Sequence, residues 1–396
     1  MDEQNFQVRV INEEKGKGIF ALRAFKEDEI IFEEKPVVCC QFSWNADYGY
    51  LACDNCMYPL ENAEENVRRL TGKKNLVLPY PEYCEIKKEL FAECPECGIK
   101  FCSNECLKEA FSKYHRILCS QTRGNKEGHP LEKLKETWKQ MHYPPETATI
   151  MLLARMIAHV NQADDKSSVL AVYNNFCHKT VNEVHEIAHN LLGEKFIGQI
   201  DVLRELLEQT FNKDYVPQWF TPEGFRSLLA LVGTNGQGIG TSAFSRWVKN
   251  VTALELPTDR RIQIDKFIDQ IYDDMDEGII KHLIISLIVV GTFLNNEGSG
   301  LYALQSTLNH SCSPNAVVEF PYSNSTLRIK AIRDIQPEDE ICIGYLDECE
   351  LERSRHSRQK LLSSLYLFVC QCDKCIAQAD DSDVTSDDDY DHDMSS

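Results

Sequence analysis

The chain has 396 residues, of which 43% are apolar and 26% charged, so it is long enough for two or three domains with a sizeable core. This composition excludes a wholly disordered chain, a collagen and a disulfide-stabilised miniprotein. The 42 Lys and Arg against 62 Asp and Glu give a net charge of −20. Because duplex affinity depends on neutralising phosphates with basic side chains, we expect no direct nucleic-acid partner, and we expect a basic protein partner instead.

Seventeen cysteines are a high number for a chain whose first residues, MDEQNFQVRV, contain no apolar signal segment. We therefore expect a reducing compartment, the cytoplasm and/or the nucleus, where clustered cysteines bind metal more often than they form disulfides. The longest apolar stretch, residues 279–294, is interrupted by Lys281 and His282. Its uninterrupted run of about twelve residues is too short to cross a bilayer, so it predicts a buried segment and no membrane association.

The hydrophobic periods alternate between strand and helix along the chain, and no internal repeat is visible. The glycine-rich run GTNGQGIG at residues 233–240 predicts a turn, because it lacks the strand before and the helix after that a dinucleotide site requires. The predicted elements in chain order are short strands over 6–42, helices over 129–213, a helix over 258–275, strands and turns over 299–346, a basic helix with an exposed face over 351–366, and a disordered acidic tail from Asp380.

Eight residues between positions 53 and 119 have metal-ligand spacing, in two C-x2-C pairs, one C-x3-C pair and one H-x3-C pair. Local pairing would leave each zinc two-coordinate, so the pairs must combine, and an interleaved arrangement joins the first pair to the third and the second to the fourth. Four protein ligands leave no open position, so both zincs are structural. The predicted sites are Cys53, Cys56, Cys102 and Cys106, and Cys94, Cys97, His115 and Cys119.

The ligand order and the segment FCSNEC resemble a MYND zinc module, with an insertion at residues 57–93. A RING module is also cross-braced, but it would place the histidine in the middle of the ligand series. GKGIFA (16–21), LNHSCSPN (308–315), EICIGYLD (340–347) and a terminal C-x-C-x2-C together resemble the SET domain of protein lysine methyltransferases. SET and MYND combined in this order resemble the SMYD family over nearly the whole chain.

The resemblance implies an α+β fold in which a β-rich SET core is split by an embedded two-zinc MYND module and a helical insertion, followed by a zinc-bound post-SET tail. The implied boundaries are 1–52 for the N-terminal part of SET, 53–119 for the MYND module with its insertion 57–93, 120–230 for a helical linker, 231–349 for the SET core with an internal insertion, 350–376 for the post-SET zinc segment and 377–396 for the disordered tail.

The resemblance also implies the methyl donor S-adenosylmethionine. Glycine permits a close backbone approach to this cofactor, lysines can face its carboxylate, and amide and imidazole groups can bind its amino-acid end and adenine. The family's Asn and His hold the cofactor, backbone at the preceding leucine contributes, and an aromatic residue packs on the adenine. The expected cofactor-binding residues are Lys15, Gly16, Lys17, Gly18, Asn235, Ser306, Leu308, Asn309, His310, Tyr345 and Phe368.

Tyr345 matches the family's catalytic tyrosine. The match implies that its hydroxyl orients the attacking lysine amine and that its ring forms one wall of the channel for the substrate lysine. A phenol with a pKa near 10 is mostly protonated at pH 7, so we do not expect a general base. A third zinc is expected on Cys370, Cys372 and Cys375, with Cys312 as the fourth ligand implied by the resemblance. Six remaining cysteines are predicted to be buried hydrophobes or surface thiols: Cys39, Cys40, Cys84, Cys177, Cys342 and Cys349.

The expected activity is methylation of lysine in a basic histone or non-histone protein, for example a ribosomal one, by a monomeric enzyme that uses three zinc ions. The alternative is an adaptor whose MYND surface recruits a proline-rich or repressor-complex partner while catalysis is vestigial. Retention of Asn309, His310 and Tyr345 together argues against the alternative. His178, His185 and His189 have near-helical spacing, which predicts a solvated or core face rather than a metal site.

Overall fold

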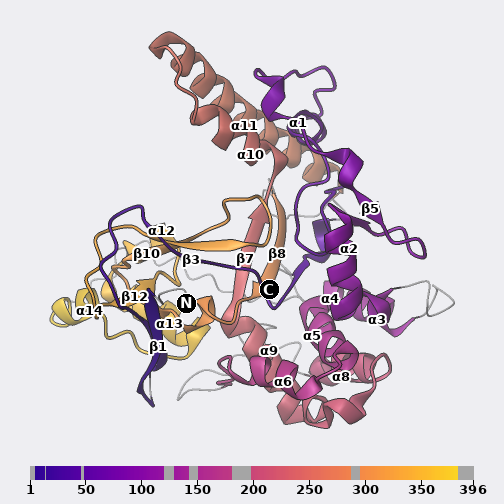
Figure 1. The fold of residues 1–396 in the computed structure, drawn as a ribbon, viewed down its shortest axis with the longest axis vertical. Coiled ribbons are helices and arrows are strands. Elements are labelled where there is room, and N and C mark those ends of the chain that lie inside the picture. The colour runs from indigo at the N-terminus through magenta and orange to yellow at the C-terminus, as the bar shows by residue number, and fades with distance from the viewer. Residues whose placement is uncertain are drawn as a thin grey trace.

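The computed structural model describes residues 5–13, 15–45, 49–119, 129–141, 150–180, 198–286 and 295–381. His185, His189, the end of the apolar segment 279–294 and most of the acidic tail lie outside these residues. The described part combines small sheets with helices, which confirms the predicted α+β class (Figure 1).

The β-rich core, which the resemblance assigns to a SET domain, consists of three small sheets whose strands come from both ends of the chain. Their orders are β1-β2-β12-β9, β10-β11-β3 and β4-β8-β7. All pairings are antiparallel except that of β12 with β9. The strands are β1 Phe6–Asn12, β2 Gly16–Ala21, β3 Ile30–Glu34, β4 Val38–Gln41, β7 Gly236–Thr241, β8 Asn296–Leu301, β9 Asn309–His310, β10 Ala316–Glu319, β11 Leu327–Ala331 and β12 Glu340–Ile343.

The glycine-rich run was wrongly predicted to be only a turn. Helix α9 ends at Asn235, and β7 begins at once and pairs with β8 from Gly236 to Thr241 (Figure 1). Gly298 and Gly300 of β8 lie close to atoms of the neighbouring strands. A Cβ at Gly298 would lie 2.3 Å from the carbonyl oxygen of Cys40. Close strand contact, rather than a phosphate, therefore accounts for glycine in β8.

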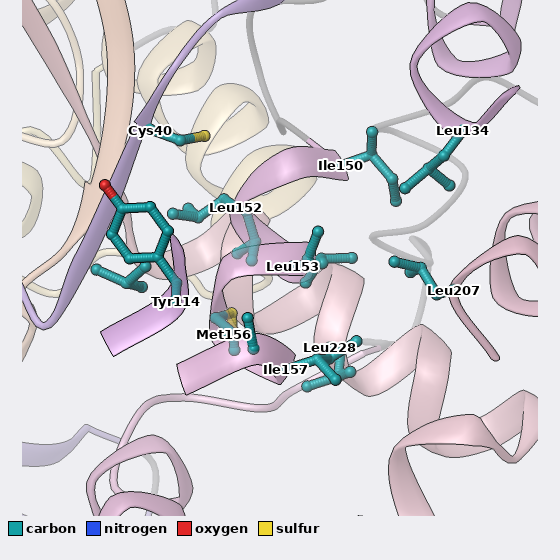
Figure 2. Packing of buried hydrophobic residues seen from close by; sticks show 14 of the residues in the cluster. Cys40, Tyr114, Leu134, Ile150, Leu152, Leu153, Met156, Ile157, Leu207 and Leu228 are labelled. Atoms are coloured by element: carbon teal, nitrogen blue, oxygen red, sulfur yellow. The ribbon is translucent and has the colours of Figure 1, made fainter. Parts of the chain in front are cut away.

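The helices between the two halves of the core surround α5, most of whose residues are buried. Leu152 faces Tyr114 and Cys40, while Leu153 and Ile150 face Leu134 and Leu207 (Figure 2). The predicted helical stretch 129–213 is confirmed where it is described. The helices are α4 Pro130–Met141, α5 Ile150–Gln162, α6 Lys166–Asn174, α8 Ile200–Glu208 and α9 Pro222–Asn235.

A second hydrophobic cluster joins two segments that are far apart in sequence. Helix α1 (Ala63–Thr71) of the 57–93 insertion packs on α10 (Ala243–Thr252) and α11 (Thr258–Ser286), which lie between β7 and β8. These helices lie together at one end of the molecule, away from the SET sheets (Figure 1). The Trp247 ring stacks on Phe244 and donates a hydrogen bond from Nε1 to the Pro79 carbonyl. The two insertions therefore stabilise each other.

Short elements complete the zinc-bearing segments. In the first of these, β5 pairs antiparallel with β6, and α2 follows Ser103, whose hydroxyl accepts from the Cys106 amide as a helix N-cap. No helix in the described ranges is long and apolar enough to cross a membrane. The remaining elements are β5 Ala92–Glu93, β6 Lys100–Phe101, α2 Asn104–Ala110, α3 Arg116–Leu118, α12 Glu348–Leu351, α13 Arg355–Tyr366 and α14 Asp373–Ala377.

Candidate active site and metal centres

A cavity of about 1140 Å³ lies where β2, the α9–β7 junction, β9, β12 and the segment before the C-terminal cysteines meet. Of the predicted cofactor-binding residues, only Gly18 is absent from its wall. The structure thus brings residues from five distant parts of the sequence into one site. Those on the wall are Lys15, Gly16, Lys17, Asn235, Ser306, Leu308, Asn309, His310, Tyr345 and Phe368.

The centre of the site is the place where the segments LNHSCSPN and EICIGYLD lie side by side. Asn309 and His310 of β9 pair in parallel with Cys342 and Ile343 of β12. Asn315 is buried and fastens the two segments, because its Oδ1 accepts from the Cys342 amide and its Nδ2 donates to the Glu340 carbonyl. The sequence motif therefore has a structural role at Asn315 that its resemblance alone did not reveal.

Tyr345 is held at both its backbone and its hydroxyl. Its amide donates to Nδ1 of His310 at 2.9 Å, and its hydroxyl donates to the carbonyl of Leu308 at 2.6 Å. Its ring lies 4.9 Å from the Tyr366 ring and 6.3 Å from the Phe368 ring, measured between centroids. Burial raises the pKa of Tyr345 well above its usual value, so the hydroxyl remains a donor at neutral pH.

Asn309 is oriented by two acceptors. Its Nδ2 donates to the Lys17 carbonyl and to Oε1 of Glu340, which leaves Oδ1 as the acceptor for a cationic ligand group. A Cβ at Gly18 would lie 2.8 Å from the same Glu340 oxygen and 3.1 Å from Nδ2. Gly18 therefore makes room for this hydrogen-bonded pair. Gly16 differs, because its φ of +70° requires the left-handed region while no atom crowds it.

The other predicted contacts have protein partners in this structure. Lys15 lies 3.9 Å from Glu340, and Lys17 donates to Asn175. Asn235 donates from Nδ2 to the carbonyls of Cys177 and Leu231, and Ser306 donates to the Ala303 carbonyl. These residues reach the cavity wall, but the two lysines are tied to polar neighbours rather than free to face a carboxylate.

The four C-terminal ligand candidates lie next to the cofactor loop. Their sulfurs lie within 4.8 Å of one another, and they are Cys312, Cys370, Cys372 and Cys375. Nε2 of His310 is 3.3 Å from the sulfur of Cys312, while its Nδ1 accepts from Tyr345. Burial lowers the pKa of His310 to about 4, so the ring is neutral at pH 7. One imidazole thus joins the four-cysteine cluster to Tyr345.

Arg358 was wrongly predicted to lie on an exposed helix face. Its side chain on α13 is fully buried, and its guanidinium lies 3.7 Å from the Cys375 sulfur. It also donates to Oε1 of Gln378 and to the Arg353 carbonyl. Four thiolates around one Zn²⁺ leave a net charge of −2, so a buried cation beside them offsets part of that charge.

The eight ligand candidates of the zinc module also form the two predicted groups, each with its ligand atoms within 4.8 Å. The interleaved pairing places the first site against α5. Arg155 of α5 is buried and donates to Asp54 and to the Cys39 carbonyl, and its guanidinium lies 4.2 Å from the Tyr114 ring centroid. This partly buried ion pair holds the first zinc-binding turn against the helical core.

The donor sets fit the groups that the sequence implies. Sets of four cysteines, or three cysteines and a histidine, at these separations suit tetrahedral zinc. The cavity suits polar ligands such as this cofactor and an amine acceptor, because the buried atoms Oγ1 of Thr234 and Oε1 of Gln305 on its wall have no hydrogen-bond partner within the described residues. Neither residue stood out in the sequence, which shows no signal for side-chain burial at isolated polar positions.

Comparison with known proteins agrees with this geometry. A SET domain is recognised over residues 16–346. The chain is 53% identical to protein-lysine N-trimethyltransferase SMYD5 of Gallus gallus and 52% identical to that of Homo sapiens, over 96% of this chain and 88% of each relative. It is 26% identical to histone-lysine N-methyltransferase SMYD3 of Mus musculus, over 94% of this chain and 62% of that protein. The solved SET domain of LSMT bound to lysine and AdoHcy aligns at 9% identity with a TM-score of 0.30, over 93% of this chain and 54% of its own.

The SET domain and the cavity define an S-adenosylmethionine-dependent protein-lysine N-methyltransferase with three four-ligand clusters that fit three zinc ions. Within that class, the chain belongs to the SMYD5 family.

Proposed function

We propose that this enzyme trimethylates lysine in a basic protein, and that Tyr345 orients the lysine amine for the transfer. The observation that carries the assignment is the hydrogen-bonded unit of Tyr345, His310 and Leu308 on the cavity wall. The number of methyl groups follows the names of the SMYD5 relatives. The net charge of −20 supports a lysine-rich substrate, such as a histone or a ribosomal protein, in the cytoplasm or nucleus.

S-adenosylmethionine would supply an electrophilic methyl group, held by Asn309, His310 and Phe368 with the backbone of residues 16–18 and 308. The protein aligns the amine and excludes water, which is the main contribution that positioning makes to such a displacement. The partly buried rings of Tyr345 and Tyr366 provide an apolar wall that favours the neutral amine over the ammonium. The protonated Tyr345 hydroxyl is fixed by Leu308 and is therefore a positioning group rather than a base.

The test is transfer of a labelled methyl group from S-adenosylmethionine to proteins of an unmethylated cell extract. We expect a labelled band with the native enzyme that is lost with Tyr345→Phe and with His310→Ala, and mass spectrometry of that band should find trimethyllysine. Cofactor affinity, measured by calorimetry, should survive Tyr345→Phe and fall in His310→Ala. Equal transfer by Tyr345→Phe would contradict the role of Tyr345, and a product that stops at monomethyllysine would contradict trimethylation.

A further inference from the structure

Gln305 has an unused hydrogen-bond acceptor on the wall of the cavity. The residue is 7% exposed, and its Oε1 is buried without a partner among the described residues. Buried polar atoms in native proteins are nearly always satisfied, and an exception calls for an explanation such as a partner that binds later. Gln305 lines the cavity, so a ligand bound there can supply the missing donor.

A second glutamine fixes which end of the Gln305 carboxamide is free. Gln237 of β7 donates from Nε2 to the Gly238 carbonyl, so its Oε1 faces Gln305 and accepts from Nε2 of Gln305 at 3.0 Å. The two side-chain amides are thus hydrogen-bonded in series, and Oε1 of Gln305 is the acceptor that remains free. Both residues line the same cavity as Tyr345.

The backbone of Gln305 is fixed as firmly as its side chain. Its amide donates to the carboxylate of Glu34 at 2.9 Å, and its carbonyl accepts from the Leu308 amide at 3.0 Å. The Leu308 carbonyl in turn accepts from the Tyr345 hydroxyl. A short hydrogen-bonded turn, Gln305–Thr307, therefore joins the free acceptor to the tyrosine that we place beside the reacting amine.

We propose that Gln305 accepts a hydrogen bond from the substrate lysine amine and that Gln237 orients it for this contact, an inference that rests on the proposed function. An N–H donor is what the free oxygen lacks, and a lysine amine in the channel offers one. A carboxamide suits this role because it carries no charge. A carboxylate in its place would stabilise the ammonium form, which has no lone pair for the attack.

The donor count of the amine makes the contact selective for methylation state. A neutral lysine amine has two N–H groups, the monomethyl form has one, and the dimethyl form has none. Gln305 therefore holds the amine for the first two transfers and loses its contact before the third. Trimethyllysine has no N–H in any protonation state, so the final product leaves the acceptor unpaired and dissociates more easily.

The experiment compares Gln305→Leu with the native enzyme on three synthetic copies of one lysine-rich peptide taken from the substrate identified above. The copies carry unmethylated, monomethyl or dimethyl lysine at the target. We expect KM for the first two to rise roughly fivefold, the size of one neutral hydrogen bond, while KM for the dimethyl peptide is unchanged. Gln237→Leu should act in the same direction with a smaller effect. Gln209→Leu, an exposed glutamine on the surface, should change nothing.

Two further readouts separate this role from structural or cofactor roles. Gln305→Leu removes one unpaired acceptor and creates another on Gln237, so the melting temperature should stay within about 2 °C of native. Calorimetric affinity for S-adenosylmethionine should also be unchanged. A weaker cofactor with unchanged peptide KM would overturn the proposal in favour of a cofactor contact. An equal loss for all three peptides would overturn it in favour of a structural role, and no transfer by the native enzyme to any peptide would instead refute the proposed function.

Gln305→Glu tests the argument about charge. It keeps the size and the acceptor but adds a negative charge that raises the pKa of the bound amine. We expect kcat of Gln305→Glu to be lower than native at pH 7 and to recover as the pH rises toward 9.5. The native enzyme should reach its full kcat at a lower pH. Identical pH profiles of native and Gln305→Glu enzymes would show that this side chain does not face the amine.

Discussion

At the scale of single residues, the site is organised by hydrogen bonds that fix polar groups before any ligand arrives. His310 accepts from Tyr345, Tyr345 donates to Leu308, and Asn309 donates to Glu340. The contacts of Asn309 leave its Oδ1 available to a ligand. Preorganised groups need little rearrangement during the reaction, which is why they are effective in catalysis.

Removing the Tyr345 hydroxyl should impair alignment of the lysine amine while leaving binding of the cofactor intact. In Tyr345→Phe we expect kcat to fall roughly a hundredfold, a loss typical of a misplaced reactant, with little change in cofactor affinity.

In the native enzyme kcat/KM should rise with pH as the lysine amine loses its proton. Because burial raises the pKa of Tyr345, its ionisation should not end this rise below about pH 10. Initial rates from pH 6 to 10 test this, and a fall above pH 8 would contradict a protonated tyrosine.

At the scale of elements, spacing within a short segment was more informative than composition. The cysteine pairs predicted their own grouping because two ligands three or four residues apart must share an ion, and the order of pairs then left few combinations. The run 233–240 was misassigned because its glycines also suit a turn, and only its pairing with the distant β8 makes it a strand. Arg358 was misassigned for a similar reason. Its burial depends on the packing of α13 against the C-terminal cysteines, which the helix's own sequence does not indicate.

Arg358 gives a prediction for α13 and the post-SET cluster. Replacing it with methionine in Arg358→Met keeps a long apolar side chain but removes the cation beside Cys375. We expect the affinity of this site for zinc to fall at least tenfold, as is usual when a neighbour of a metal ligand is lost. Chelator competition monitored by released zinc measures this. Arg353→Met, on an exposed residue of the same segment, is the control and should retain native affinity.

At the scale of the whole molecule, distant segments are joined at three places. The zinc module packs on α5, the two insertions share the core of α1, α10 and α11, and the C-terminal cysteines lie against Cys312. The resemblance predicted the third of these connections but not the packing of the zinc module on α5. The contact between the insertions was not predicted either, because neither insertion contains a motif and their apolar residues share one cluster far from each other in sequence. The helices of the two insertions lie together at one end of the molecule (Figure 1).

Loss of one ligand should therefore have different effects on folding and on cofactor binding in the different clusters. Native protein should contain three zincs per chain by elemental analysis. Cys94 is fully buried within the main core, so Cys94→Ser should lose one zinc and much of the folded protein, because metal binding at such a site contributes directly to folding.

Cys372 lies at the outer edge of the post-SET cluster, so Cys372→Ser should also leave about two zincs while the cooperative melting of the main core persists. The Cys372→Ser protein should nevertheless bind S-adenosylmethionine poorly, since the cluster fixes Cys312 two residues from His310. Melting curves and calorimetry on the same samples distinguish the two variants. Native cofactor affinity in Cys372→Ser would show that the cofactor loop is held without the third metal, and a melting loss equal to that of Cys94→Ser would show that the clusters stabilise one cooperative unit.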